Sequence, residues 1–470
     1  MKKIFAILLF AAAVFALVGC EKANTPCEHS YTEEIIEEPG VLTPGKAKCV
    51  CSLCGESSEY ELPATKTLKI LAIGNSFSVD GMQYLWDICR DGGVENVILG
   101  NMYIGGCSLN KHWTNMQSGA GAYKYYKNTE GKWETTEEFS IPNAIKDEEW
   151  DIITVQQSSG DSGETETYSA LADITAYIQE HKTNPDAKIY WHMTWAYQGD
   201  STNKHFPRYD SDQKKMYEAI ASVAQNFVLK NEDIAGLIPS GTAIQNLRSS
   251  YVGDTVTRDG YHLSYSHGRY TAALTWFAYI TGGDIDGITW MSAEHNVFED
   301  IEPIKEAVKN ALEAPFEVTP SAFDKAVEKT DLDRIIALGL DPANMELLDW
   351  GPTVASYWNS GSKFELIHAG NSKASNIPYF ISSRKLTKDD LPVGSVIIVD
   401  KGYGYRPDGW LDLDGTKGAR PQKVGAGAAL VTEEWWGEYA VRGFNLYSLE
   451  SNYVMTTGDI EAMRIYVPKK

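Results

Sequence analysis

The sequence is poor in basic residues and in long apolar runs. It contains 42 lysines and arginines against 64 aspartates and glutamates, which gives a formal net charge of −22 at pH 7. A nucleic-acid-binding protein needs a basic surface to neutralise phosphates, so this composition argues against a nucleic-acid partner. After the N-terminal segment no apolar run is long enough to span a bilayer. Hydrophobic residues at 43% and charged residues at 23% indicate a globular rather than a disordered chain.

The N-terminus has the pattern of a bacterial lipoprotein signal. Two lysines precede an apolar run from Ile4 to Val18, which is too short for a comfortable membrane span. The run leads into the letters LVGC, closed by Cys20, and this resembles a lipobox. We expect residues 1–19 to be removed and lipid on Cys20 to anchor the protein to a bacterial membrane, facing the periplasm or the exterior. The alternative is a plain secretory signal with a chance cysteine.

A small group of cysteines follows the signal. Cys27 and His29 begin the group, and Cys51 and Cys54 end it in a C-x-x-C-G knuckle. Two such pairs can close a tetrahedron around zinc, and we expect this metal to be structural. The segment resembles short Cys/His modules that recur in surface proteins of gut bacteria. Because Cys49 is spare and the cell envelope is oxidising, disulfides are the alternative. Either staple would help so short a segment to fold.

The chain is too long for one ordinary core, so two or three folded units are expected from its 470 residues. We predict a signal peptide, a Cys/His module with a spacer, an α/β domain and a β-rich accessory domain, which occupy residues 1–19, 20–66, 67–315 and 316–470.

The third segment alternates between strand and helix patterns. This alternation predicts a parallel sheet with helices on both faces, where ligands bind at the carboxyl ends of the strands. Helices are expected at Tyr168–His181 and Ser211–Leu229. The expected strands are Leu68–Ile73, Asn96–Gly100, Trp150–Val155, Ala187–Trp195 and Ala235–Pro239.

The fourth segment consists of short apolar runs separated by glycine and proline, which favours a β-sandwich. The expected strands are Leu391–Val399, Leu430–Thr432, Gly437–Val441, Phe444–Tyr447 and Met463–Val467. Several aromatic residues in this segment either stack on sugar rings or pack in the core. They are Tyr403, Tyr405, Trp410, Trp435 and Trp436.

A serine follows the first strand of the α/β segment. Gly74 closes the strand, and Asn75, Ser76 and Phe77 come next. A serine at a strand-to-helix turn projects its hydroxyl over the edge of the sheet, and the N-terminus of the next helix can stabilise an oxyanion there. The pattern is weak alone, because Asn-Ser is also an ordinary helix cap.

A second pattern supplies the base that such a serine requires. Asp259 stands three residues before His262. The imidazole can accept the serine proton, and the carboxylate can orient the imidazole and stabilise its charged form. A capping aspartate beside a surface histidine is one alternative, and a pair of metal ligands is another. Metal is disfavoured, since no third acid or histidine lies close by in the sequence.

These patterns together resemble the SGNH/GDSL hydrolase superfamily, and within it a branch of Bacteroides-type lipoproteins of unknown function. Its G-[DN]-S block matches the turn at Ser76, its D-x-x-H block matches Asp259 and His262, and its glycine block matches Gly106. The resemblance covers residues 67–282 and implies a flavodoxin-like sheet with Ser76 as nucleophile, His262 as base and Asp259 as orienting acid. It also implies that the N–H groups of Ser76 and Gly106 form part of an oxyanion hole.

The third block of the superfamily differs in this chain. Gln156 and Gln157 stand where the family has G-x-N-D, as in a variant of the sialate-type O-acetylesterases. We assign Gln157 as the third oxyanion donor, although strand alternation cannot choose between the two glutamines. Trp195 follows the fourth strand, and we expect it to line the substrate groove. We expect neither His112 nor His192 to be the base.

The combined hypothesis is a serine esterase of the bacterial cell envelope that hydrolyses O-acyl esters of carbohydrates, above all O-acetyl esters. It needs no cofactor for catalysis, and we expect a monomer whose partners are an acylated glycan and the membrane. The alternative is a catalytically silent, glycan-binding surface lipoprotein.

Overall fold

The computed structural model describes most of the chain after residue 26. The chain divides into two compact units, Met1–Ala64 and Thr65–Lys470. Cys20, Trp410, Trp435, Trp436 and the expected strand Gly437–Val441 lie outside the described residues. The described residues are 27–292, 295–326, 329–350, 352–360, 363–367, 378–382, 386–400, 402–408, 427–433, 443–448 and 457–469.

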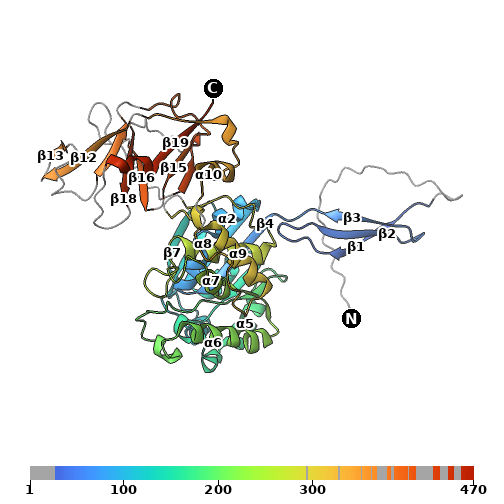
Figure 1. Cartoon of the computed structure of the whole chain (residues 1–470). Coiled ribbons are helices and arrows are strands. Elements are labelled where there is room, and N and C mark those ends of the chain that lie inside the picture. Colours follow the sequence, from blue (N-terminus) through green and yellow to red (C-terminus); the bar gives the residue numbers. More distant parts are fainter. Residues whose placement is uncertain are drawn as a thin grey trace. The chain divides into compact units, whose positions relative to one another are not determined.

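The first unit is a three-stranded antiparallel sheet (blue in Figure 1). Its strands are β1 (Tyr31–Glu37), β2 (Gly45–Cys51) and β3 (Ser57–Leu62), with β2 in the centre. Ala47 and Cys51 are its buried hydrophobic residues among those described, and every residue of β1 is exposed. So small a core cannot stabilise a sheet alone, which is why a staple matters in this unit.

A seven-stranded sheet forms the centre of the second unit. Five of its strands are parallel, and in chain order they lie in the arrangement 2-1-3-4-5, which is the flavodoxin-like order. This confirms the predicted fold class. From edge to edge the strands are β10 (Ile234–Ile238), β9 (Lys188–His192), β8 (Ile152–Val155), β4 (Thr67–Gly74), β5 (Asn96–Tyr103), β6 (Tyr123–Asn128) and β7 (Trp133–Phe139).

Helices flank this sheet in two groups. α8 is buried around most of its circumference because α1, α2, α7 and α9 pack around it, whereas α5 packs with α3 and α4. Among the described residues, no helix is both long and apolar enough to cross a membrane. The helices are α1 (Ser76–Met82), α2 (Leu85–Asp91), α3 (Leu109–Ser118), α4 (Ile141–Asp147), α5 (Leu171–His181), α6 (Gln213–Asn226), α7 (Ser240–Arg248), α8 (His267–Thr281) and α9 (Ile301–Glu313).

After α10 (Asp331–Ala337), the described residues of the C-terminal part form short strands in three small sheets. The four-stranded sheet has the order β11 (Met345–Leu347), β19 (Met463–Pro468), β15 (Val396–Val399) and β17 (Gly427–Leu430). The others are β13 (Lys363–Ile367), β12 (Pro352–Ser360) and β14 (Pro378–Ser382), and the pair β16 (Tyr403–Asp408) and β18 (Gly443–Ser448).

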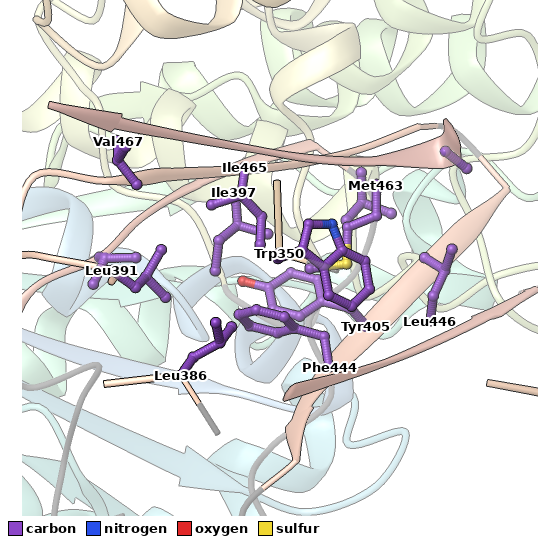
Figure 2. Close-up of a cluster of buried hydrophobic side chains, with 13 residues drawn as sticks. Trp350, Leu386, Leu391, Ile397, Tyr405, Phe444, Leu446, Met463, Ile465 and Val467 are labelled. Carbon is purple, nitrogen blue, oxygen red and sulfur yellow. The ribbon is translucent and has the colours of Figure 1, made fainter. Parts of the chain in front are cut away.

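One buried cluster joins two of these sheets. Ile397 and Ile465 of the four-stranded sheet meet Tyr405, Phe444 and Leu446 of the two-stranded sheet (Figure 2). Side chains from two sheets therefore share a core, as a sandwich-like domain requires. Tyr405 is only 1% exposed, so it packs in this core and is not a sugar platform. Tyr403 packs against the same cluster, and its hydroxyl donates to Asp459 over 2.5 Å.

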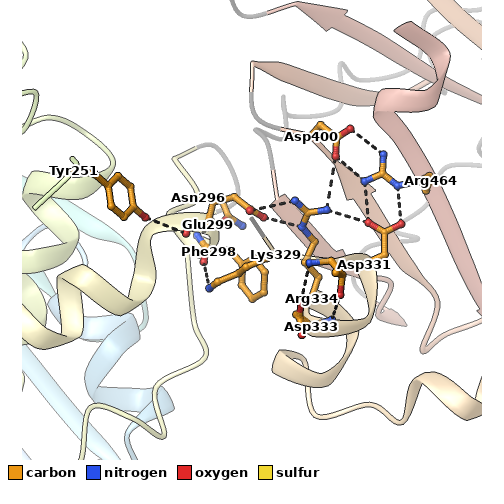
Figure 3. Close-up of polar contacts among 11 residues, drawn as sticks. Tyr251, Asn296, Phe298, Glu299, Lys329, Asp331, Asp333, Arg334, Asp400 and Arg464 are labelled. Atoms are coloured by element: carbon orange, nitrogen blue, oxygen red, sulfur yellow. Dashed lines mark hydrogen bonds and ion pairs between the residues drawn. The ribbon is translucent and has the colours of Figure 1, made fainter. Parts of the chain in front are cut away.

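Charged side chains link the segment before α9 to the C-terminal strands (Figure 3). Arg334 donates to both carboxylate oxygens of Glu299, at 2.8 and 3.1 Å, and to Asp331 at 3.0 Å. Arg464 of β19 in turn donates to Asp331 and to Asp400. Because most of these groups are partly withdrawn from water, bidentate pairing satisfies them better than isolated surface contacts would.

Candidate active site

The turn between β4 and α1 presents Ser76. Asn75 caps the helix, since its side-chain oxygen accepts from the N–H of Phe77 at 3.0 Å. The amide of Asn75 donates to the carbonyl of Cys107 at 3.1 Å, which ties this turn to the turn after β5. The strand ends therefore bring Ser76 and the Gly106 turn to the same edge of the sheet, where flavodoxin-like folds bind ligands.

Ser76, His262 and Asp259 form one hydrogen-bonded chain. His262 Nε2 lies 2.8 Å from Ser76 Oγ, and His262 Nδ1 lies 2.6 Å from Asp259 Oδ2. The other carboxylate oxygen accepts from the backbone N–H of His262 at 2.8 Å. The three side chains thus stand in the order that a nucleophile, a base and an orienting acid take in serine hydrolysis. The structure brings these three predicted residues together although 186 positions separate Ser76 from His262.

The pKa of Asp259 indicates which ring nitrogen of His262 carries a proton in this contact. Partial burial by itself raises the pKa of Asp259, but hydrogen bonds from the ring and backbone of His262 outweigh it and lower the pKa below its usual range. The carboxylate is therefore ionised and can only accept, so His262 Nδ1 carries the proton. An imidazole whose single proton is on Nδ1 presents the lone pair of Nε2, which here lies 2.8 Å from Ser76 Oγ.

Two backbone N–H groups, in the turns after β4 and β5, were predicted to form part of the oxyanion hole. Ser76 is the first residue of α1, so its N–H has no partner within the helix. Gly106 is exposed and has a φ of 61°, and no atom lies within 4 Å of the position that a Cβ would take. Among the described residues, neither N–H donates to another group. The geometry is compatible with the predicted oxyanion role, which stays a prediction.

The prediction for Gln157 is wrong in this structure. Its side chain is 1% exposed, and its amide nitrogen donates to the carbonyl and hydroxyl oxygens of Thr167, at 3.1 and 3.0 Å. Its oxygen accepts from the backbone N–H groups of Leu109 and Ser158. With both amide hydrogens engaged, Gln157 has none for an oxyanion. It holds two loops together instead.

Gln156 supports the turn between β4 and α1 that presents Ser76. Its amide donates to the side-chain oxygen of Asn75 at 2.9 Å, and its own oxygen accepts from His192 Nδ1 at 2.8 Å. Burial lowers the pKa of His192 to about 3, so this imidazole is neutral. His112 is also buried, bonds to the hydroxyl of Tyr123, and has its pKa lowered to about 3 by burial. In line with our expectation, the histidine that meets Ser76 is His262 and neither of these two.

Trp195 does not line a groove, so the prediction that it is a substrate-binding residue is wrong. Its side chain is 0% exposed, so no sugar can stack on it. The ring stacks on Phe77 with 4.3 Å between centroids and 6° between planes. Its N–H donates to the carbonyl of Tyr261 at 2.8 Å. Trp195 therefore contacts the neighbours of Ser76 and of His262, and supports the site from inside the core.

Asp80 was missed by sequence reasoning. It lies one helical turn after Ser76 on α1, is 0% exposed, and accepts hydrogen bonds from Arg258, Leu263 and Arg269. An aspartate inside an otherwise buried helical face was the available signal, because a buried carboxylate needs a cationic partner.

The four predicted metal ligands lie together in the first unit. The ligand atoms of Cys27, His29, Cys51 and Cys54 all lie within 4.8 Å of one another. Cys27 and Cys51 have their sulfurs 3.9 Å apart, and Cys54 Sγ lies 3.4 Å from His29 Nδ1. A tetrahedral zinc ion with Zn–S bonds of about 2.3 Å would set sulfurs about 3.8 Å apart, so the donor set fits zinc.

The outer contacts of this cluster also suit a metal. His29 Nε2 lies 3.7 Å from Glu56 Oε2, and an outer carboxylate of this kind orients a ligating imidazole. The sulfur separation is too long for the S–S bond of about 2.05 Å, and the described cysteines are free thiols. The disulfide alternative is therefore disfavoured.

Comparisons with known proteins place the site in a family context. Residues 69–297 match the family described as "Domain of unknown function (DUF4886)". A crystal structure of a DUF4886 family protein from Bacteroides uniformis is 40% identical, covers 54% of this chain and 98% of its own, and has a TM-score of 0.52. A search of curated proteins found no match.

Two other proteins with solved structures are more distant. TesA is 13% identical over 46% of this chain and 98% of its own, with a TM-score of 0.30. An acetylxylan esterase from Geobacillus stearothermophilus is 10% identical over 48% of this chain and 97% of its own, with a TM-score of 0.29. Similarities of this size carry no argument about activity.

Proposed function

Because the chain belongs to the DUF4886 family, whose description leaves the activity open, we propose from the site itself that the protein is an SGNH-type serine ester hydrolase. One observation carries the proposal. The chain Ser76–His262–Asp259 is continuous, with contacts of 2.8 and 2.6 Å, at the ligand-binding edge of a flavodoxin-like sheet.

The geometry supports hydrolysis through an acyl-enzyme. Ser76 Oγ attacks the ester carbonyl carbon while its proton passes to His262 Nε2, and Asp259 stabilises the imidazolium. The N–H groups of Ser76 and Gly106 receive the oxyanion. As the tetrahedral species collapses, the C–O bond to the alcohol breaks and His262 returns the proton to the departing oxygen. Water, deprotonated by His262, then attacks the acyl carbonyl carbon. The C–O bond to Ser76 Oγ breaks as His262 returns the proton to Oγ, which releases the acid and free Ser76.

We further propose O-acyl carbohydrates, above all O-acetyl esters, as the substrates, at the surface of a bacterial envelope. The support is the N-terminal sequence, whose apolar run and Cys20 favour export and lipid anchoring. The aromatic residues, which make up 11% of the chain, favour a sugar ligand. This proposal includes the expectation of a monomer that meets the membrane through its anchor.

A substrate panel tests the function. The full chain should hydrolyse short-chain aryl esters. Its kcat/KM should be higher for O-acetylated sugars or oligosaccharides than for esters with longer acyl chains. Release of acetate, measured for each glycan, identifies the sugar. A protein that binds acetylated glycans but releases no acid from any ester would instead be the silent glycan-binding lipoprotein.

We also propose that Cys27, His29, Cys51 and Cys54 hold one structural zinc ion. The support is the donor set and its spacing. When bound, the ion would link the segment before β1, with Cys27 and His29, to the C-x-x-C-G knuckle at the end of β2. The hydrolytic step needs none of these residues.

A further inference from the structure

Asp80 occupies a position from which it can control the geometry of the proposed triad. It lies on α1, the helix that begins at Ser76, and its side chain is 0% exposed. Its carboxylate accepts from Arg258 at 2.9 and 3.2 Å and from the backbone N–H of Leu263 at 2.9 Å. Arg269 adds contacts through Nε and Nη2, both at 2.8 Å.

Two of the three partners of Asp80, Arg258 and Leu263, belong to the loop that carries His262. Arg258 and Leu263 directly flank the stretch from Asp259 to His262. The two ends of this loop are joined to each other, because the N–H of Arg258 donates to the carbonyl of His262 at 2.9 Å and Thr257 pairs with Leu263. Among the described residues, hydrogen bonds to the Asp80 carboxylate come only from this loop and from Arg269.

Two rigid elements therefore meet at one carboxylate. The nucleophile and Asp80 share a helix, and the base and acid sit on a closed loop whose two ends bind Asp80. The second arginine, Arg269, lies at the start of α8, so the junction also reaches the helix that follows the loop. The aromatic ring of Tyr265 contacts both guanidinium groups. Its centroid lies 4.9 Å from Arg258 Cζ and 4.7 Å from Arg269 Cζ.

We propose that Asp80 is a positioning residue that holds the Asp259–His262 loop in register with Ser76. The inference rests on the proposed esterase function, which gives that register its purpose. Replacement of the buried carboxylate by an amide removes the counter-charge that two partly exposed arginine side chains share, 25% exposed for Arg258 and 12% for Arg269, and weakens the contacts that hold the loop against α1. A shift of about 1 Å at His262 is enough to lower turnover by about 10²-fold, because proton transfer depends on the contact with Ser76.

The test compares Asp80→Asn with Glu299→Gln in the full chain. Both changes replace a carboxylate that binds arginine with an amide of the same size, but Glu299 binds Arg334, outside the site. Asp80→Asn should lower kcat on a short-chain aryl ester by about 10²-fold with little change in KM. Glu299→Gln should melt at a lower temperature and keep the wild-type kcat. Equal kcat values for Asp80→Asn and wild type would overturn the inference.

A second readout does not depend on turnover. The proton between His262 Nδ1 and Asp259 should give a low-field NMR resonance in the wild type and in Glu299→Gln, and Asp80→Asn should broaden or abolish it. If the wild type hydrolyses no ester but the resonance behaves in this way, the function fails and the positioning role survives. A resonance unchanged in Asp80→Asn would contradict the positioning role.

A milder variant guards against a failure to fold. Arg258→Gln removes one partner and leaves the contacts of Asp80 with Leu263 and Arg269. It should lower kcat less than Asp80→Asn and leave KM unchanged. In a Ser76→Ala background neither change should lower the residual rate further, since a positioning residue acts through the triad. A further loss in that background would show that Asp80 acts in another way.

Discussion

At the scale of single residues, the chemistry depends on which polar groups are already satisfied. Ser76 and His262 meet each other, and the ionised Asp259 fixes the proton on the far side of the imidazole. Gln157 and Trp195 lie near them but have their hydrogen-bonding groups engaged in the protein. Both therefore support the structure, and each assignment can be tested by one substitution.

Gln157→Ala should reduce stability and leave catalysis unchanged in the protein that remains folded. Removal of the side chain leaves the N–H groups of Leu109 and Ser158 without their acceptor, at a cost on the order of 1–3 kcal/mol. Urea denaturation measures the loss of stability, and kcat on an aryl acetate shows whether catalysis is unchanged. A fall in kcat of about 10²-fold or more in folded protein would return Gln157 to the oxyanion hole.

Trp195→Phe should lower kcat without raising KM for a glycan substrate. Phenylalanine can still stack on Phe77 but cannot donate to the carbonyl of Tyr261, so the loop that carries His262 loses one tether. The lost hydrogen bond should also cost about 0.5–1.5 kcal/mol of stability. Steady-state kinetics on a glycan and on an aryl ester separate the two roles. A higher KM on the glycan alone would restore Trp195 to substrate binding.

At the scale of secondary-structure elements, strong local patterns were predictable from sequence. The buried run of β4 and the turn into α1 follow from continuous apolar residues closed by Gly74 and capped by Asn75. The hairpin of β6 and β7 was missed, because β6 consists of tyrosine, lysine and asparagine and β7 is largely exposed, so neither strand is an apolar run. The available signal was the alternation in β6, where Tyr123 and Tyr125 are buried and Lys124 between them is exposed.

The error over Gln157 has a similar physical origin. β8 ends at Val155, so Gln156 and Gln157 lie past the strand, where the alternation of side chains no longer applies. Trp195 was misplaced for a comparable reason, because it follows β9 in a segment that folds back into the core. The triad was predictable because its spacing is local at each end, whereas Asp80 and its arginines become neighbours only through the fold.

The three-stranded N-terminal sheet should depend on metal. Removal of zinc by a chelator, or the substitution Cys54→Ser, should unfold β1–β3 because Ala47 and Cys51 give this unit almost no core. Elemental analysis should find one zinc per chain before chelation, and circular dichroism of residues 20–66 should follow its loss. Esterase activity of the full chain should survive. An absence of zinc, with disulfides found by non-reducing mass spectrometry, would contradict this account.

At the scale of the whole molecule, the unit Thr65–Lys470 contains both the α/β sheet with the candidate site and the C-terminal sheets. The α/β core leads through α9 into the C-terminal sheets, and a continuous polar link joins them, formed by Glu299, Arg334, Asp331 and Arg464. The buried cluster around Tyr405 and Phe444 gives the C-terminal sheets a core of their own. Glycan binding by this part would require exposed aromatic residues, and Tyr405 is not one of them.

The central claim is that His262 and Asp259 activate Ser76 as a nucleophile. The most direct measurement is mass spectrometry of the full chain after exposure to a fluorophosphonate, which modifies only activated serines. We predict one adduct per chain, on the peptide that contains Ser76, with none in Ser76→Ala and a much slower reaction in His262→Ala. Labelling of Ser76→Ala at the wild-type rate, or an unlabelled wild-type protein, would contradict the account.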